Sequence, residues 1–213
     1  IPVERARSLV EFLHDVARCN VRGAFPKYLL RQQSYWTVFG APDCPAQGLI
    51  NEEGMVEVRR AGFSLEPFLR CDGRWLTWAD ATHTQALRDG YLPVPSVLRR
   101  HGDLSLHVRA TAVDIANVWC AWLSYTVENT GKQAQAVDLV VAARPFQVVP
   151  PWQAYHEFGG LHTIESMEWS DGCLQIDQGN WVFPRAVTGC NTRGWLQPRL
   201  LDGAVRAGLA QVQ

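Results

Sequence analysis

Hydrophobic and polar residues alternate along the stretch from Leu104 to Ala112, which reads Leu-Ser-Leu-His-Val-Arg-Ala-Thr-Ala. Side chains on a β-strand point in turn to opposite faces of a sheet, so a period of two predicts a strand with one buried face. Further apolar runs at 119–127 and 137–143 follow after short polar connections. Three such runs in succession predict an antiparallel sheet with a buried side.

Turn signals separate the other apolar runs. Asp72-Gly73 stands between the runs 63–71 and 75–78, and a second Asp-Gly pair stands at Asp171-Gly172. This pair favours the type I′ hairpin turn, whose two central residues both need positive φ. From Tyr28 onwards the chain reads as strands, without helical periodicity. The predicted fold class is therefore all-β: a large antiparallel two-sheet β-sandwich with an N-terminal α-helix.

The N-terminal helix is predicted from apolar residues that recur at spacings of three and four between Val3 and Ala17. Gly23 and Pro26 close the helical region. We divide the chain into an N-terminal helix or connector, residues 1–26, and a β-sandwich domain, residues 27–213. The helix either packs on the side of a sheet or joins a neighbouring domain. Val94-Pro95 predicts an extended loop.

Composition excludes several classes of function. The net charge of −1 over 213 residues argues against a nucleic-acid or anionic-membrane partner, and no apolar run reaches the length of a membrane helix. Six cysteines without a C-x-x-C pair argue against a zinc site and predict free buried thiols in a reducing compartment such as the cytoplasm. The chain begins with Ile1, and we expect a segment of a longer polypeptide.

Nine tryptophans are a heavy aromatic load, and aromatic rings both stack on sugars and fill protein cores. Trp119 and Trp122 lie three apart on a predicted strand, so they point to opposite faces, and we expect both in the core. Trp78 precedes Asp80 and His83, and an aromatic ring beside a carboxylate and an imidazole fits a sugar-contacting set. The alternative is a strand end with a capping aspartate.

A second candidate set lies on the loop at 151–160, which carries prolines, glycines and aromatic residues. The candidates for sugar contact there are Trp152, Tyr155, His156 and Glu157. The alternative is a crossover between sheets, with the aromatics closing one end of the sandwich. No helical His-Glu-x-x-His motif, phosphate-binding glycine loop or serine nucleophile elbow is present, so we assign no metal, no cofactor and no catalytic residue.

Three segments resemble a known domain: Leu69-Arg-Cys-Asp-Gly-Arg-Trp-Leu-Thr-Trp-Ala-Asp80, Tyr125-Thr-Val-Glu-Asn-Thr-Gly131 and Ala143-Arg-Pro-Phe-Gln-Val148. Together they resemble the galactose-mutarotase-like supersandwich domain that precedes the (α/α)6 barrel of many glycoside hydrolases and phosphorylases. The resemblance implies a supersandwich with a connector helix. The catalytic carboxylates of that family normally lie on the barrel, for which this chain has no room.

The resemblance therefore implies a non-catalytic, carbohydrate-associated domain of a larger enzyme. Its implied partners are a catalytic domain in the same polypeptide, a weakly or indirectly contacted sugar, and a second copy of the chain in a homodimer. One alternative is a stand-alone aldose 1-epimerase, for which His83, His107, Glu157 and His162 are the available acid and base groups. The other is an interaction module without a ligand, whose tryptophans are all core.

Overall fold

The computed structural model describes residues 9–150, 160–184, 199–201, 204–206 and 209–212. Within them the chain is an all-β protein with one N-terminal helix, α1 (Leu9–Cys19), and two short 3-10 helices, η1 (Lys27–Leu30) and η2 (Trp78–Asp80). The strands up to residue 144 are β1 (Trp36–Gly40), β2 (Gln47–Asn51), β3 (Val56–Glu57), β4 (Ser64–Cys71), β5 (Arg74–Leu76), β6 (Thr82–Arg88), β7 (Leu92–His101), β8 (Leu104–Ile115), β9 (Val118–Asn129) and β10 (Gln135–Arg144). The later ones are β11 (Met167–Ser170), β12 (Cys173–Ile176), β13 (Asn180–Val182), β14 (Arg199–Leu201), β15 (Ala204–Arg206) and β16 (Leu209–Val212).

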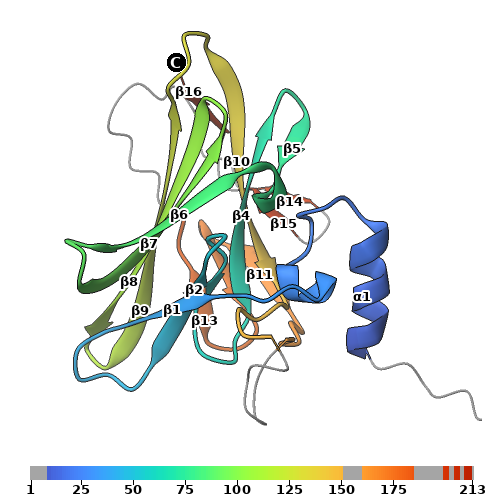
Figure 1. The fold of residues 1–213 in the computed structure, drawn as a ribbon. Helices are drawn as coiled ribbons and strands as arrows, with labels where there is room; N and C mark the ends of the chain where they lie inside the picture. The colour runs from blue at the N-terminus through green and yellow to red at the C-terminus, as the bar shows by residue number, and fades with distance from the viewer. Residues whose placement is uncertain (1–8, 151–159, 185–198, 202–203, 207–208, 213) are drawn as a thin grey trace, which may run out of the picture.

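These strands form three antiparallel sheets. The large sheet runs in the order β1-β2-β3-β4-β10-β15-β14, with β5 paired to β4 and β16 paired to β10. The four-stranded sheet is a meander, β6-β7-β8-β9, and the three-stranded sheet has the order β11-β12-β13. The four-stranded sheet forms one side of the molecule in Figure 1, opposite β4 and β10 of the large sheet.

The main core lies between the four-stranded sheet and one half of the large sheet. The alternating apolar residues of β8 are buried there, as the sequence predicts: Leu104, Leu106, Val108, Ala110 and Ala112. They pack against buried side chains of the large sheet: Phe39, Ile50, Val56, Leu69 and Val137. Full burial of each larger aliphatic side chain stabilises the fold by roughly 1.5–3 kcal/mol. The predicted two-sheet sandwich is confirmed.

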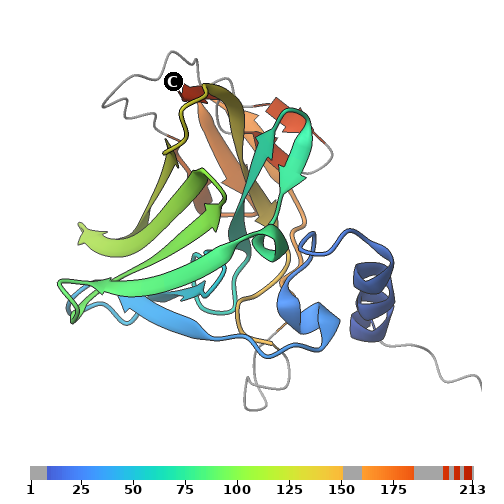
Figure 2. The same ribbon diagram turned by 45° about the horizontal axis from the view of Figure 1, so that its top comes forward.

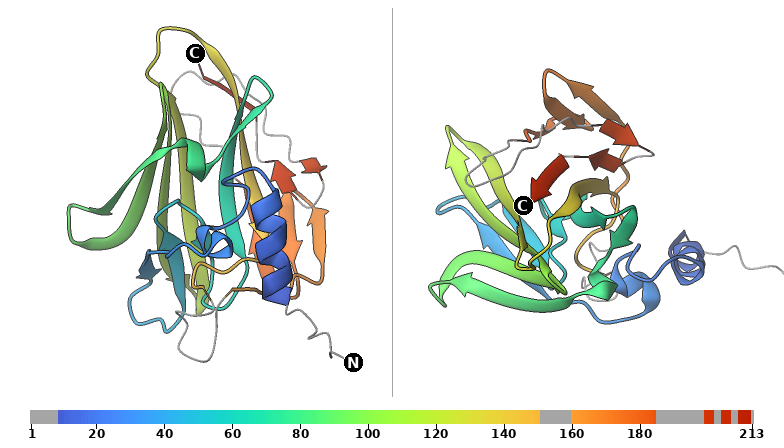
Figure 3. Two further views of the ribbon diagram at one scale, coloured as in Figure 1. Left: turned by 45° about the vertical axis from the view of Figure 1, so that its right-hand side comes forward. Right: turned by 90° about the horizontal axis from the view of Figure 1, so that it is seen from above.

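The other half of the same face of the large sheet is covered by the three-stranded sheet (Figure 3). Leu174 and Ile176 of β12 pack there against Leu65 of β4 and Val141 of β10. Tyr125 of β9 contacts both this cluster and the main core. The large sheet therefore supports two smaller sheets side by side.

Arg144 fastens the N-terminal segment to the large sheet. Its Nη1 donates to Glu66 Oε2 at 2.5 Å and to the main-chain oxygen of Ala24 at 2.8 Å. Its guanidinium also lies over the rings of Phe25 and Phe146, at 5.3 and 4.6 Å from their centroids. These contacts position η1 against the large sheet, while α1 packs on η1 at the outside of the molecule (Figure 2).

Both predicted Asp-Gly hairpins are confirmed. Asp72 and Gly73 have φ values of 49° and 79° and join β4 to β5. Asp171 and Gly172 have φ values of 50° and 77° and join β11 to β12. Positive φ at both central residues is the requirement of the type I′ turn.

Three sequence predictions are wrong. Tyr28 lies in η1, where its buried ring and its hydroxyl bond to the Gly160 carbonyl fix a helical turn. Pro95 lies in β7, because the ladder to β8 begins only at Ser96 and leaves the proline outside it. Trp122 is 61% exposed on the outer face of the four-stranded sheet, whereas Trp119 faces inward and stacks on Phe39.

The cysteines in the described residues are unpaired, but only Cys173 is buried; Cys19 is exposed, and Cys190 lies outside the described residues. The prediction of free buried thiols therefore holds in full for Cys173 alone. No helix in the described part of the chain combines the length and apolar character that a membrane crossing requires.

The core assignment predicts unequal costs for two truncations on β8. Leu106→Ala removes a side chain that is fully enclosed between the sheets, so it lowers the free energy of unfolding by about 2–5 kcal/mol. Val113→Ala, on the exposed face of the same strand, changes it by about 0.5 kcal/mol or less. Urea denaturation followed by circular dichroism measures both. Equal costs would contradict the assignment of the buried face.

Candidate functional site

The candidate site begins at an opening in the large sheet. On one edge of β4, β3 pairs with residues 64–65 and β5 pairs with residues 69–71. Residues 66–68 therefore have no strand partner on that edge, although β10 runs along the other. Pro67 lies at this opening, and a proline is tolerated in a strand where no neighbour needs its missing N–H.

Arg99 of β7 fills the opening. It is only 1% exposed, and its Nη1 donates to the Pro67 carbonyl at 2.8 Å and to the Glu53 carbonyl at 3.4 Å. Its Nε and Nη2 make no hydrogen bond. Burial lowers the pKa of Arg99 to about 10, while the carboxylates of Glu66 and Glu53 act in the opposite direction, so the guanidinium is charged at neutral pH.

His83 and His101 flank this arginine on the inner face of the four-stranded sheet. His83 of β6 is the cross-strand partner of Arg99, and His101 lies two residues further along β7. We call His83, Arg99 and His101 the polar row. Burial, and then the charge of Arg99, lowers the pKa of each histidine to about 4. Both imidazoles are therefore neutral at pH 7.

The ring nitrogens of the polar row are largely without hydrogen-bond partners. His83 Nε2 makes none, and neither ring nitrogen of His101 makes one within hydrogen-bonding geometry. The Asp80 main chain lies close enough to His101 to raise its pKa by a smaller, opposing amount. The row thus holds several buried nitrogen atoms that have no hydrogen-bond partner.

Acidic residues approach from the turn between β2 and β3. Asn51 Oδ1 accepts from the main-chain N–H groups of Glu53 and Met55, and this holds the turn closed. Lys27 of η1 forms an ion pair with Glu53 and lies 3.1 Å from Glu52 Oε1. Burial and the neighbouring Glu52 raise the pKa of Glu53 to about 7, and Lys27 partly offsets them.

Trp78 and Asp80, predicted as sugar contacts, lie at the same end of the sandwich as His83. Trp78 is buried, its Nε1 donates to the Phe25 carbonyl at 3.0 Å, and Lys27 Nζ lies 5.5 Å from the centre of its ring. Asp80 accepts from Thr77 N and Oγ1 in a capping box. Burial would raise the pKa of Asp80, but the Thr77 hydrogen bonds lower it. Asp80 therefore caps η2, which is the alternative that the sequence left open.

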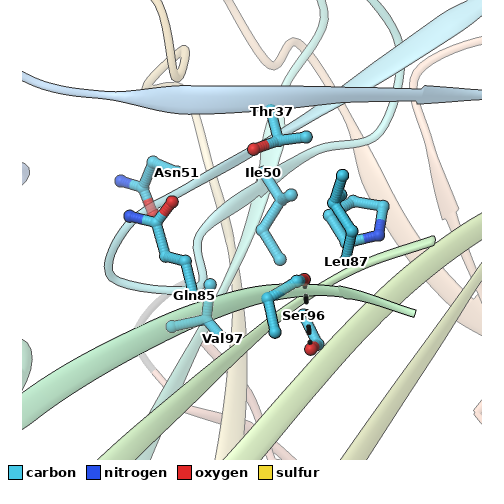
Figure 4. A pocket seen from close by; sticks show the side chains of 9 residues that line it. Thr37, Ile50, Asn51, Gln85, Leu87, Ser96 and Val97 are labelled. Carbon is cyan, nitrogen blue, oxygen red and sulfur yellow. Dashed lines mark hydrogen bonds between the residues drawn. The ribbon is translucent and has the colours of Figure 1, made fainter. Parts of the chain in front are cut away.

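A groove lies along the edge of the sandwich (Figure 4), and none of the three residues of the polar row lines it. Its volume is about 210 Å³. It lies between the large sheet and the β6–β7 hairpin and is lined by Thr37, Ile50, Asn51, Gln85, Ala86, Leu87, Pro95, Ser96 and Val97. Gln85 and Val97 each lie two residues from a member of the polar row on the same strand, so they share its face. None of the lining side chains is charged.

The other predicted site residues are not brought to this place. Trp152, Tyr155, His156 and Glu157 lie outside the described residues. His107 pairs with Leu98, so it lies on the outer face of the four-stranded sheet, away from His83. His162 instead faces Asp177 beside the three-stranded sheet, with 3.6 Å between Nε2 and Oδ2. Within the described residues, no group of three His, Cys, Asp or Glu side chains could hold a metal ion.

Sequence reasoning missed Lys27, Glu53, Arg99 and His101. The alternation of side chains along β7 could have identified Arg99 and His101, because residues two apart in a strand share one face. That face of β7 carries Pro95, Val97, Arg99 and His101. A charged residue at a position in phase with buried apolar residues is unusual and marks a special environment.

Comparison with known proteins does not assign the chain to a family. No protein-family model, no curated protein and no solved structure matches the chain. We therefore infer the function from the chemistry of the groove and its surroundings.

The low pKa of His83 is directly testable. The folded state holds His83 neutral down to about pH 4, whereas the unfolded chain protonates this imidazole below about pH 6.5. The stability that the neutral imidazole contributes is therefore fully present above pH 6.5, and the free energy of unfolding declines as the pH falls towards 4. We expect its NMR titration midpoint near pH 4, and His83→Gln should flatten the decline of unfolding free energy in that range. A midpoint near 6.5 would contradict the described burial.

Proposed function

We propose that this chain is a non-catalytic, carbohydrate-associated β-sandwich domain of the supersandwich type. It binds a neutral saccharide in the groove beside the polar row and packs against a catalytic domain of the same polypeptide. The observation that carries the proposal is the uncharged groove, which combines amide and hydroxyl groups with an apolar floor.

The lining of the groove supports a polyhydroxylated, uncharged ligand. Ile50, Val97 and Leu87 provide apolar surface for the C–H faces of a sugar ring. Gln85 and Thr37 provide an amide and a hydroxyl, which both donate and accept hydrogen bonds as sugar hydroxyls require. Small-molecule sites commonly combine a mostly apolar lining with a few placed polar groups. The groove is small and open, so we expect weak binding.

The outer face of the four-stranded sheet supports packing against another domain. Val113, Ile115, Val118 and Trp122 are all exposed there, at the end where β8 turns into β9. Clustered exposed apolar side chains of this size are typical of surfaces that another protein surface covers. A neighbouring domain of the same polypeptide is the partner that the resemblance implies.

An aldose 1-epimerase is the second candidate function, and Glu53 is the observation that favours it. A carboxyl group with a pKa of about 7 is suited to proton exchange at neutral pH. Polarimetry on freshly dissolved α-glucose or α-galactose separates the two functions. Faster mutarotation than in buffer alone would favour the epimerase over the non-catalytic domain.

The saccharide proposal predicts selective loss of binding at the groove. Titration with maltose, cellobiose and lactose at millimolar concentration, followed by NMR, should shift the signals of groove residues. Gln85→Leu should weaken the affinity about fivefold, because one net hydrogen bond contributes about 1 kcal/mol. Thr84→Val is the matched control on β6, since its side chain lies on the opposite face and should leave the affinity unchanged. No shift with any saccharide would instead favour the interaction module.

A further inference from the structure

We infer that β9 pairs edge to edge with β9 of a second copy of the chain, so that two four-stranded sheets join into one continuous antiparallel sheet. Within the part of the chain that the structure describes, β9 is the last strand of its sheet and pairs with β8 alone. The inference does not depend on saccharide binding in the groove. The neighbouring domain proposed above would cover the outer face of the sheet, whereas this contact uses the edge of the strand.

The turn between β8 and β9 determines which main-chain groups point away from the sheet. Ala116 and Asn117 form a two-residue turn with φ values of 54° and 64°, and Ile115 pairs with Val118 beside it. Such a turn closes on a hydrogen-bonded pair, and bonded and non-bonded pairs then alternate along the ladder. The even-numbered residues of β9 therefore bond to β8. The odd-numbered residues in the range 119–127 direct their N–H and C=O groups outward.

The edge of β9 lacks the features that usually protect an exposed strand. Native proteins shield such edges with charged side chains, prolines, bulges or short strands. β9 has 12 residues in unbroken register with β8, and it contains no proline, lysine or arginine. Its one charged residue is Glu128. The opposite edge strand, β6, is shorter and has a register shift between Leu87 and Arg88. This contrast favours β9 as the edge that another strand covers.

The core side of β9 is also incompletely covered. Its inward side chains pack against the main core, yet each of them is only partly buried: Trp119, Ala121, Leu123, Tyr125 and Val127. The corresponding apolar side chains of the neighbouring strand β8 are all buried. A strand added beside β9 places its own inward side chains next to this row, because directly opposite residues in a ladder share a face. Both the ladder and the core are therefore extended by one partner.

A second copy of β9 is compatible with this edge. A twofold axis pairs identical strands in antiparallel orientation. With the axis at Leu123, Trp122 lies opposite Ser124 of the partner subunit and Glu128 lies opposite Val118 of the partner subunit. The two Glu128 carboxylates are then at opposite ends of the contact. A parallel pairing in register would place them side by side, where like charges are destabilising. The charge pattern therefore favours the antiparallel, twofold arrangement.

The test measures the mass of the intact chain by analytical ultracentrifugation from micromolar to submillimolar concentration, together with amide hydrogen exchange. We expect a dimer that forms as the concentration rises. The outward N–H groups of Ala121 and Leu123 should become protected in step with it, because they bond to the partner strand. The Trp122 N–H bonds to β8 and should be protected at every concentration. Because this experiment uses the unmodified protein, it does not depend on the folding of a variant.

A proline variant and a matched control complete the experiment. Ala121→Pro removes an outward N–H but no bond to β8, so the urea midpoint of the monomer should be nearly unchanged. It should weaken dimer affinity about tenfold or more, because twofold symmetry repeats the lost hydrogen bond. Val113→Ala, on the outer face of β8, is the control and should leave dimer affinity unchanged.

Three outcomes would overturn the inference. One is a chain that stays monomeric at every concentration, and another is a dimer in which Ala121 and Leu123 remain unprotected. The third is a folded Ala121→Pro variant that dimerises as well as the original chain. Each of these results leaves the proposed saccharide site standing, because that site is measured separately at the groove.

Discussion

A buried positive charge at the opening of the large sheet organises one end of this protein. Arg99 supplies hydrogen bonds to main-chain oxygens that no neighbouring strand can reach, at Pro67 and Glu53. A buried guanidinium requires nearby negative charge, and Glu66 and Glu53 provide it from two different elements. The same side chain therefore closes the large sheet and joins it to the four-stranded sheet.

The second arginine extends this arrangement to the N-terminal segment. Arg144 ties Glu66 to the chain at Ala24 and Phe25, and this brings Lys27 of η1 over Trp78 and beside Glu53. The site thus combines residues from η1, the β2–β3 turn, η2, β6 and β7. Its formation depends on the docking of the N-terminal segment as much as on the two sheets.

Local patterns in the sequence predicted much of the fold. The alternation in β8 and the Asp-Gly turns act over a few residues, and both were confirmed. Tertiary contacts overrode local pattern elsewhere. Tyr28 sits in a helical turn fixed by a bond to Gly160, 132 residues away, and Trp122 is exposed because the outer face of its sheet has no cover in the described residues.

The candidate site was only partly predictable for the same reason. Trp78, Asp80 and His83 are close in the sequence, and the sequence grouped them. Arg99 meets His83 only through the register of β6 on β7, and Glu53 meets Lys27 only through the docking of η1. Neither pairing can be recognised from a short sequence motif, because the paired residues are far apart in the chain.

The measurement that tests the proposed binding site most directly is the NMR signal of the Gln85 side-chain amide during saccharide titration. If the groove binds a neutral saccharide, this signal shifts and saturates as the saccharide concentration rises, while the main-chain amide signals on the outer face of the four-stranded sheet stay fixed. If the Gln85 signal stays fixed with every saccharide, the groove is not a saccharide site.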